Sequence, residues 1–258
     1  MSPTTIKHLS GVLHKGFNDA IKWRMLNLNP CDAVTSPKRS KHEIRVASQE
    51  ELERIIEGVT GHYLEIPVFL GITTGARLGE ILGLSWDSID LDKGIIRITQ
   101  ALKLSNNGGL ILSDPKTARG KRSIEIGPQV VKRLTEYKAE QAAWKLQSGE
   151  NWRNEHNLVC TLNDGNWIRP NTASSTFGDI ARRLGINISF HALRHGHATE
   201  LLKAGVNPKI VCERLGHSTV SMTLDVYSHV VPGMQKEAAR VIDTLLNKED
   251  EKIALKKQ

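Results

Sequence analysis

The sequence predicts an α+β protein that is mostly α-helical and carries a small three-stranded antiparallel β-sheet. Apolar residues recur at helical spacing in a first segment and through most of the chain after Pro128. Between these regions, turn residues separate three β-rich runs, GIIRITQAL, GGLILSD and RSIEIG. Hydrophobic residues make up 39% of the 258 residues and charged residues 24%, which suits one or two domains with a sizeable core.

The first helix is predicted over residues 5–26, where apolar side chains recur at mostly helical spacing. They are Ile6, Leu9, Val12, Leu13, Phe17, Ile21 and Trp23. A lone helix on a linker cannot bury its own apolar face. We therefore expect it either to dock on the main domain or to belong with further helices.

A basic segment with two prolines follows over residues 30–47. Pro30 and Pro37 break the helical pattern. The segment carries the cations Lys38, Arg39, Lys41 and Arg45. Two interpretations stay open, because the segment could be a solvated connector or a strap along a phosphate backbone.

The main domain is predicted to open at Ser48. Ser48 and Glu51 form a capping box ahead of an apolar helix face. A second helix follows through YLEIPVFLGITTG, before the β-rich runs. Further helices are predicted over residues 128–147, 171–184, 191–204, 208–215, 218–228 and 233–247.

The net charge indicates what kind of partner the protein binds, and the cysteines indicate its redox compartment. The formal net charge is +7, which suits a polyanionic partner. Cys31, Cys160 and Cys212 lie far apart without CxxC spacing, so we expect buried free thiols in a reducing compartment. There is no apolar run of about 20 residues and no signal peptide, so we expect a cytoplasmic protein without a membrane partner.

Two segments could present cations to an anion. In TTGARLGE, Gly75 and Gly79 flank Arg77, and Glu80 follows at a spacing that allows an ordinary ion pair or an arginine oriented for phosphate. In DPKTARGKR, Pro115 and Gly120 suggest a turn. This hairpin carries Lys116, Arg119, Lys121 and Arg122. It could be a solvated loop, or it could deliver a lysine to a reacting phosphate.

The stretch HALRHGH places His191, Arg194 and His195 on one helix face. Zinc could use both histidines, but the zincin pattern needs a Glu where Ala192 stands. An anion site at a helix N-terminus fits better. We expect His195 and His197 to be packing or hydrogen-bonded residues.

Further along, LGH places His217 in a turn that Ser218 can follow as a helix cap, and Tyr227 comes late in the next predicted helix. A tyrosine is usually half-buried core. Its phenol could instead be a nucleophile if positive charges surround the phosphate that it attacks.

The order TGARLGE, PKT, HALRH, LGH and Y resembles the tyrosine recombinases, also called the phage integrase family, from Ser48 to about Asn247. The resemblance implies that Tyr227 attacks a DNA phosphodiester and forms a 3′-phosphotyrosyl link. Arg77 and Arg194 would hold the phosphate, with Glu80 bracing the site. His191 would be the general base, and His217 would bind the phosphate. Lys116, favoured over Lys121, would protonate the leaving oxygen.

The resemblance also implies a domain order. Residues 1–29 would be the last helix of a truncated N-terminal core-binding domain, and residues 30–47 a basic interdomain linker. Residues 48–247 would be the catalytic domain, and residues 248–258 a charged C-terminal tail. The helix over 233–247 would pack on a neighbouring protomer.

The implied partner is double-stranded DNA at specific recombination sites. The predicted DNA contacts are Lys38, Arg39, Lys41, Arg119, Lys121 and Arg122. The protein would be a monomer when free and a homo-tetramer in the synaptic complex, with a directionality factor or host DNA-bending protein as a further partner. It would be bacterial or phage-encoded, nucleoid-associated, and free of cofactor and metal.

Three alternatives remain open beside integration or excision of a mobile element. A type IB topoisomerase shares the tyrosine chemistry and would relax any supercoiled DNA. A non-catalytic remnant would bind DNA without cutting it. A zinc hydrolase would be built on His191 and His195.

Overall fold

The computed structural model describes residues 1, 3–34, 45–114, 120–217, 219, 239 and 243. The chain divides into two compact units, residues 1–43 and 44–258. Some predicted features lie outside the described residues. They are Lys38, Arg39, Lys41, Lys116, Arg119, Ser218, Tyr227, the tail 248–258, all of the helix over 218–228 except residue 219, and all of the helix over 233–247 except residues 239 and 243.

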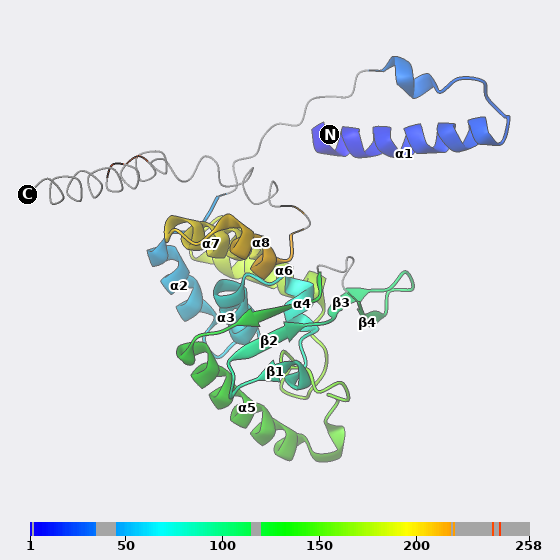
Figure 1. The fold of residues 1–258 in the computed structure, drawn as a ribbon. Helices are drawn as coiled ribbons and strands as arrows, with labels where there is room; N and C mark the ends of the chain where they lie inside the picture. Colours follow the sequence, from blue (N-terminus) through cyan, green and yellow to red (C-terminus); the bar gives the residue numbers. More distant parts are fainter. Residues whose placement is uncertain are drawn as a thin grey trace, which may run out of the picture. The chain divides into compact units, whose positions relative to one another are not determined.

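The order of elements follows the predicted α+β class (Figure 1). The α-helices are α1 (Pro3–Lys22), α2 (Gln49–Val59), α3 (Glu65–Thr74), α4 (Leu78–Leu82), α5 (Pro128–Ser148), α6 (Pro170–Arg183), α7 (Phe190–Lys203) and α8 (Pro208–Leu215). The strands are β1 (Ile89–Asp90), β2 (Ile95–Ile98), β3 (Ala101–Leu104), β4 (Leu110–Ser113) and β5 (Arg122–Glu125). Short 3₁₀ helices are η1 (Pro30–Ala33), η2 (Trp86–Ser88) and η4 (Gly149–Asn151).

The predicted sheet exists, but its strands are grouped differently. β1, β2 and β5 form a three-stranded antiparallel sheet, whereas β3 and β4 form a separate two-stranded one. The run GIIRITQAL therefore makes two strands, broken at Thr99 and Gln100. The Gln100 amide donates to the Gly83 carbonyl (2.8 Å), which holds the chain against α4 at this break.

Strand β3 approaches the backbone of α4 closely. A Cβ at Gly79 would lie 2.8 Å from the Leu102 carbonyl oxygen, and one at Gly83 would lie 2.7 Å from the Leu102 amide nitrogen. Glycine at both positions permits this contact. The contact fixes α4, which starts directly after Arg77.

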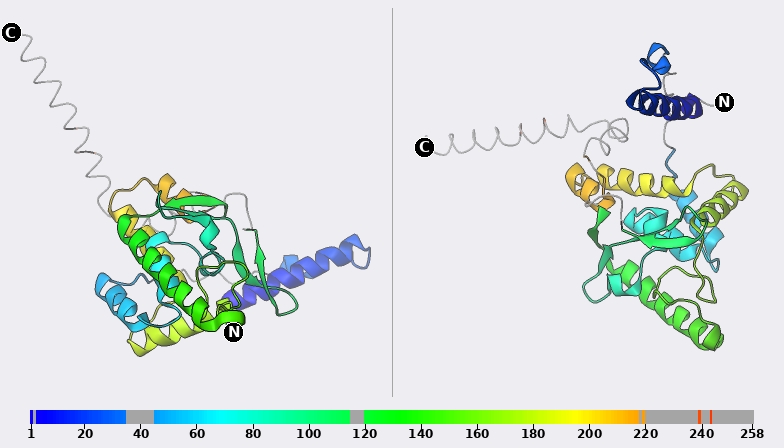
Figure 2. Two further views of the ribbon diagram at one scale, coloured as in Figure 1. Left: turned by 90° about the horizontal axis from the view of Figure 1, so that it is seen from below. Right: turned by 90° about the vertical axis from the view of Figure 1, so that its right-hand side faces the viewer.

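The core of the residue 44–258 unit forms where α3 packs against α7. Phe177 of α6 and Phe190 of α7 meet edge to face with ring centroids 5.3 Å apart. Figures 1 and 2 show α7 and α8 at one end of this unit and α5 at the other, with the three-stranded sheet between them. Packing therefore brings α7 and α8 beside the end of α3 and the start of α4.

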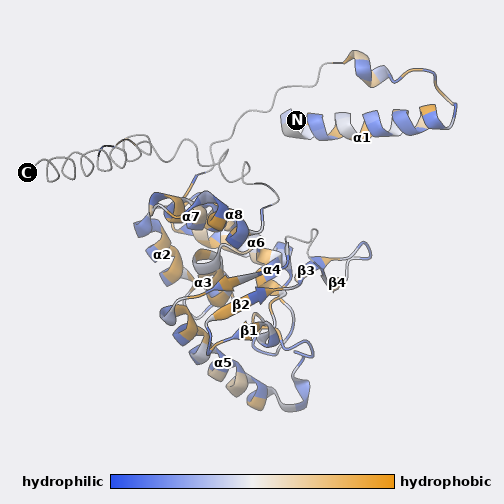
Figure 3. Cartoon of the chain, in the orientation of Figure 1, coloured by the Kyte–Doolittle hydropathy of each residue, from blue (hydrophilic) through white to orange (hydrophobic). Residues whose placement is uncertain are grey.

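The first unit contains α1 and η1. The polar and apolar residues of α1 alternate along the helix (Figure 3), and Leu9, Val12 and Leu13 are exposed. The first residues of the predicted linker, 30–33, form η1. The Asn29 amide donates to the His14 carbonyl (3.0 Å), and His14 pairs with Asp32 (2.8 Å), so η1 folds back on α1.

The cysteines are free thiols, as predicted, and Cys160 and Cys212 are buried, but Cys31 is only half-buried. Across the described residues, none of the helices combines the length and the apolar character that a membrane span requires.

Candidate active site

Two of the predicted arginines bind adjacent carbonyls at the C-terminal end of α8. Buried Arg194 donates to the Leu215 carbonyl (2.7 Å) and to the Gly75 carbonyl (2.8 Å). Arg77 donates to the Gly216 carbonyl (3.2 Å). Carbonyls at a helix end lack helical partners and carry partial negative charge, so they are suitable anchors for guanidinium groups.

A third arginine occupies the same helix end. Arg122 donates through Nε to the Arg214 carbonyl (2.7 Å). Three consecutive carbonyls, those of residues 214–216, thus accept hydrogen bonds from three different arginines. The Arg122 side chain is only 6% exposed. Its burial contradicts our prediction of a surface DNA contact, because packing against α8 and Glu80 removes it from the hairpin surface.

Glu80 is the carboxylate that these arginines share. It accepts from Arg77 Nη1 (2.8 Å), from the Arg77 backbone amide (2.9 Å) and from Arg122 Nη2 (2.8 Å). Burial raises the pKa of Glu80, but the hydrogen bonds and charges of Arg122 and Arg77 together outweigh burial, so the net pKa is lowered. Glu80 therefore stays ionised, and its single negative charge offsets only part of the surrounding positive charge.

Three histidines line the same region in their neutral form. The rings of His191 and His195 lie 4.6 Å apart, edge to face. Burial, with the positive charges of Arg194 and Arg77, lowers the pKa of His191 and lowers that of His217 to about 4. Burial, with His191 and Arg194, lowers the pKa of His195 to about 4. Neutral imidazoles can accept a proton or a hydrogen bond at neutral pH.

His197 has a different task, and its predicted hydrogen-bonded role is confirmed. Its Nδ1 lies 2.9 Å from the Ile72 carbonyl, and its Nε2 lies 3.1 Å from Arg214 Nε. A carbonyl only accepts and a guanidinium only donates, so Nδ1 carries the proton and Nε2 accepts. His197 thereby ties α7 to the end of α3 and to α8.

Steric constraints explain why two positions of the predicted motifs are glycine. Gly75 and Gly216 have φ values of +64° and +67°. A Cβ at Gly75 would lie 2.7 Å from the side chains of His197 and Leu215, and one at Gly216 would lie 2.9 Å from Arg122 Nη1. Both turns therefore need glycine to admit the groups packed on them.

The structure brings together four of the six predicted catalytic residues: Arg77, His191, Arg194 and His217. The other two, Lys116 and Tyr227, lie outside the described residues. Lys121 is exposed and pairs with Asp114 (3.2 Å). Sequence reasoning missed the inward role of Arg122 and the contribution of Arg214, since carbonyl partners leave no signal in residue type.

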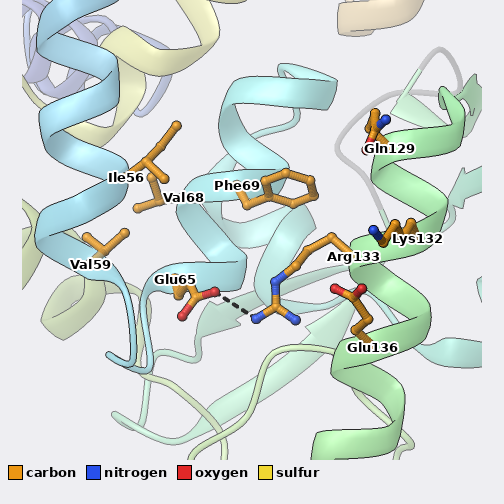
Figure 4. A pocket seen from close by; sticks show the side chains of 9 residues that line it. All are labelled: Ile56, Val59, Glu65, Val68, Phe69, Gln129, Lys132, Arg133 and Glu136. Carbon is orange, nitrogen blue, oxygen red and sulfur yellow. Dashed lines mark hydrogen bonds and ion pairs between the residues drawn. The ribbon is translucent and has the colours of Figure 1, made fainter.

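A cavity of about 400 Å³ adjoins the His217 turn. Its lining residues are Lys121, Arg122, Lys209, Cys212, Glu213, Gly216 and His217. Lys209, at the start of α8, was not singled out from the sequence. A second cavity of about 370 Å³ lies between α2, α3 and α5 (Figure 4), and its lining includes none of the predicted site residues.

For the zinc alternative, the described part of the chain contains no group of three or more histidine, cysteine or acidic side chains arranged to hold a metal. His191 and His195 thus lack a third protein ligand among those residues, whereas catalytic zinc sites commonly have three.

Comparison with known proteins identifies the family. Residues 45–233 match the sequence model of the phage integrase family. The chain belongs to this family. It is 34% identical over 261 residues to a tyrosine recombinase XerC-like protein of Caldanaerobacter subterraneus subsp. tengcongensis, covering 95% of this chain and 67% of that protein. It is 28% identical over 250 residues to the ICEBs1 integrase of Bacillus subtilis, with the same two coverages of 95% and 67%.

Solved structures of integrases share the fold. The Tn1549 transposon integrase in complex with a circular intermediate DNA has a TM-score of 0.77 at 20% identity, covering 93% of this chain and 80% of that one. A lambda integrase tetramer bound to a Holliday junction has a TM-score of 0.59 at 19% identity, with coverages of 84% and 57%. The predicted fold class and family resemblance are therefore confirmed.

Proposed function

We propose that the protein is a site-specific DNA recombinase that cuts and rejoins DNA strands to integrate or excise a phage or other mobile element. The observation that carries this proposal is the convergence of Arg77 and Arg194 on neighbouring carbonyls at the C-terminal end of α8, beside three neutral histidines. Two fixed guanidinium groups can bind the non-bridging oxygens of one phosphodiester. A neutral imidazole can accept the proton that a hydroxyl nucleophile loses when it attacks this phosphodiester.

In this mechanism Arg77 and Arg194 stabilise the charge that builds on the phosphate as it is attacked. Arg77 suits the task because 44% of its side chain is exposed. Its contacts within the described residues use only two of its five N–H groups. The remaining donors can point to DNA.

Tyr227 would supply the nucleophile and become linked to the DNA 3′-phosphate, releasing a 5′-hydroxyl. His191 would accept the phenol proton, and His217 would donate a hydrogen bond to the phosphate. Lys116 would protonate the leaving 5′-oxygen, with Lys121 as the alternative. The phosphotyrosyl link stores the energy of the broken bond, so rejoining would need neither ATP nor metal.

The proposed partners follow from this chemistry. The net charge of +7 and exposed Lys121 and Lys209 suit a DNA backbone. Strand exchange between two duplexes would require several protomers, in a homo-tetramer, and a directionality factor could set its direction. The protein would act in the cytoplasm, where bacterial or phage DNA lies.

Covalent capture tests the proposal. The protein is mixed with nicked suicide duplexes in EDTA, denatured in SDS and examined for protein–DNA adducts, with Tyr227→Phe beside it. We expect an adduct with the wild type and none with Tyr227→Phe. A gel shift without an adduct would instead favour a non-catalytic DNA-binding protein, and relaxation of any supercoiled plasmid would favour a topoisomerase.

A further inference from the structure

Arg122 lies where the basic hairpin enters strand β5, and it contacts both structures that hold Arg77 in place. We propose that Arg122 is a positioning residue: it orients the Arg77 guanidinium through Glu80 and holds the Gly216–His217 turn through the Arg214 carbonyl. This inference rests on the proposed recombinase function, in which Arg77 binds the reacting phosphate.

The first route runs through the Glu80 carboxylate. Oε1 accepts from Arg77 Nη1 (2.8 Å) and from Arg122 Nη1 (3.2 Å). Oε2 accepts from the Arg77 backbone amide (2.9 Å) and from Arg122 Nη2 (2.8 Å). Each oxygen thus serves both arginines. Arg122 therefore fixes the plane of the carboxylate, and that plane sets the direction of the Arg77 side chain.

The second route runs through the end of α8. Arg122 Nε donates to the Arg214 carbonyl (2.7 Å). A Cβ at Gly216 would lie 2.9 Å from Arg122 Nη1, so the guanidinium packs directly on this turn. The Gly216 carbonyl of this turn accepts a hydrogen bond from Arg77 Nη2 (3.2 Å), and His217 belongs to the same turn. Arg122 therefore supports the acceptor of Arg77 as well as its carboxylate partner.

Arg122 is placed to act through other residues and not on DNA directly. Its side chain is 6% exposed, and both of its Nη atoms donate to the Glu80 carboxylate, which balances its charge. Arg194 is also buried, but its Nη atoms donate to the neutral carbonyls of Gly75 and Leu215, which do not cancel a full charge. Arg77, with 44% of its side chain exposed, is the member of the group that faces outward. A buried arginine that supports an exposed one preorganises the binding group, because that group then needs no reordering when the phosphate arrives.

The test compares two substrates in Arg122→Met and Arg122→Lys. One nicked duplex has an ordinary phosphodiester at the scissile position, and the other has a methylphosphonate there. The methylphosphonate lacks one charged oxygen, so its cleavage depends less on an arginine. Arg122→Lys retains a positive charge beside the buried Glu80 carboxylate, so this variant should still fold. A single ammonium group cannot reproduce the planar hydrogen-bonding geometry of a guanidinium.

We expect both variants to cleave the phosphodiester roughly 10- to 100-fold more slowly than the wild type, as for a small misplacement of a catalytic group. The half-saturating DNA concentration should stay unchanged. On the methylphosphonate the variants should approach the wild-type rate. Arg133→Met, which removes an ion-paired arginine contacting Glu65 and Glu140, is the matched control and should cleave both substrates at the wild-type rate.

Three results would overturn the inference. The first is cleavage of the phosphodiester at the wild-type rate by the Arg122 variants, and the second is an equal loss of rate on both substrates. The third is a raised half-saturating DNA concentration, which would mark Arg122 as a DNA contact. If the wild type forms no adduct with either substrate, the proposed function fails instead. The inference is then judged by the ¹⁵N NMR signal of the Arg77 side chain. That signal should shift in Arg122→Lys and stay in place in Arg133→Met; an unshifted signal in Arg122→Lys would overturn it.

Discussion

Two clusters of charged residues in the residue 44–258 unit differ in how the charge of their arginines is balanced. Beside the cavity between α2, α3 and α5, Arg133 pairs with Glu65 (2.7 Å), as Figure 4 shows. Arg133 also pairs with Glu140 (2.9 Å). At the end of α8, Arg77 and Arg122 share the single carboxylate of Glu80. The first cluster therefore has more negative than positive charge, whereas the second keeps excess positive charge.

This difference in charge balance distinguishes a structural ion pair from a site that can bind an anion. Burial lowers the pKa of Arg133, but its hydrogen bonds to Glu65 and Glu140 outweigh burial and raise it. The α8 cluster instead relies on helix-end carbonyls, which bind guanidinium groups without cancelling a full charge. Burial lowers the pKa of nearby His217, and the positive charges of Arg194 and Arg77 lower it further. The excess positive charge of this cluster is available to a phosphate.

The largest expected difference between the clusters is in catalysis. Arg77→Ala should slow adduct formation by about 10²- to 10³-fold, the usual cost of removing one donor to transition-state charge. Arg133→Ala should leave the rate unchanged. Single-turnover adduct formation on a nicked duplex measures both. A wild-type rate in Arg77→Ala would remove Arg77 from the mechanism.

The next largest difference should be in stability. Glu80→Gln leaves two arginines without their carboxylate, one of them 6% exposed, so the free energy of unfolding should fall by about 3 kcal/mol. Glu65→Gln removes a partly exposed pair in which Arg133 retains Glu140, and should cost about 1 kcal/mol or less. Urea unfolding of both variants measures these free energies. Equal losses of unfolding free energy in the two variants would show that the two clusters contribute equally to stability.

A smaller effect separates two helix-ending glycines. Gly216 and Gly205 have φ values of +67° and +79°, so alanine at either should cost about 1 kcal/mol of backbone strain. A Cβ at Gly205 meets nothing within 4 Å, whereas one at Gly216 meets Arg122. Gly216→Ala should therefore lose more stability and also slow adduct formation, while Gly205→Ala should cleave normally. Indistinguishable variants would argue against tight packing of Arg122 on the turn.

The smallest effect at neutral pH concerns the histidines around the α8 cluster. The pKa values of His195, His197 and His217 are lowered from 6.5 to about 4, chiefly by burial. Between these values the unfolded chain binds protons that the folded chain does not. The free energy of unfolding should therefore decrease as pH falls from about 6.5 to about 4, and these groups should contribute no change above pH 6.5.

NMR titration of the imidazole C–H signals checks this directly. Three signals should show no titration between pH 7 and pH 5 in the protein without DNA, since pKa values near 4 leave those rings neutral there. Titration of the same three signals near pH 6.5 would contradict the electrostatic description of the site.

Much of the local structure could be predicted because it depends on near neighbours in sequence. The Ser48 capping box is present with both of its hydrogen bonds, and helix α8 has the predicted bounds of 208–215. Apolar spacing and capping residues act within a few positions of the chain, so the sequence displays them. The motif residues Arg77, Arg194 and His217 could likewise be selected, because their order along the chain matches a known family.

Contacts between distant segments could be decided only by the tertiary structure. The sequence placed Arg122 on a basic hairpin surface, but packing buries it between Glu80 and the end of α8. The pairing of β4 with β3, separate from β2, also depends on how β3 docks on α4. The physical reason is the same in both cases. A residue's type determines which groups it offers, but the backbone carbonyls and neighbouring strands that receive it are set by the folded chain.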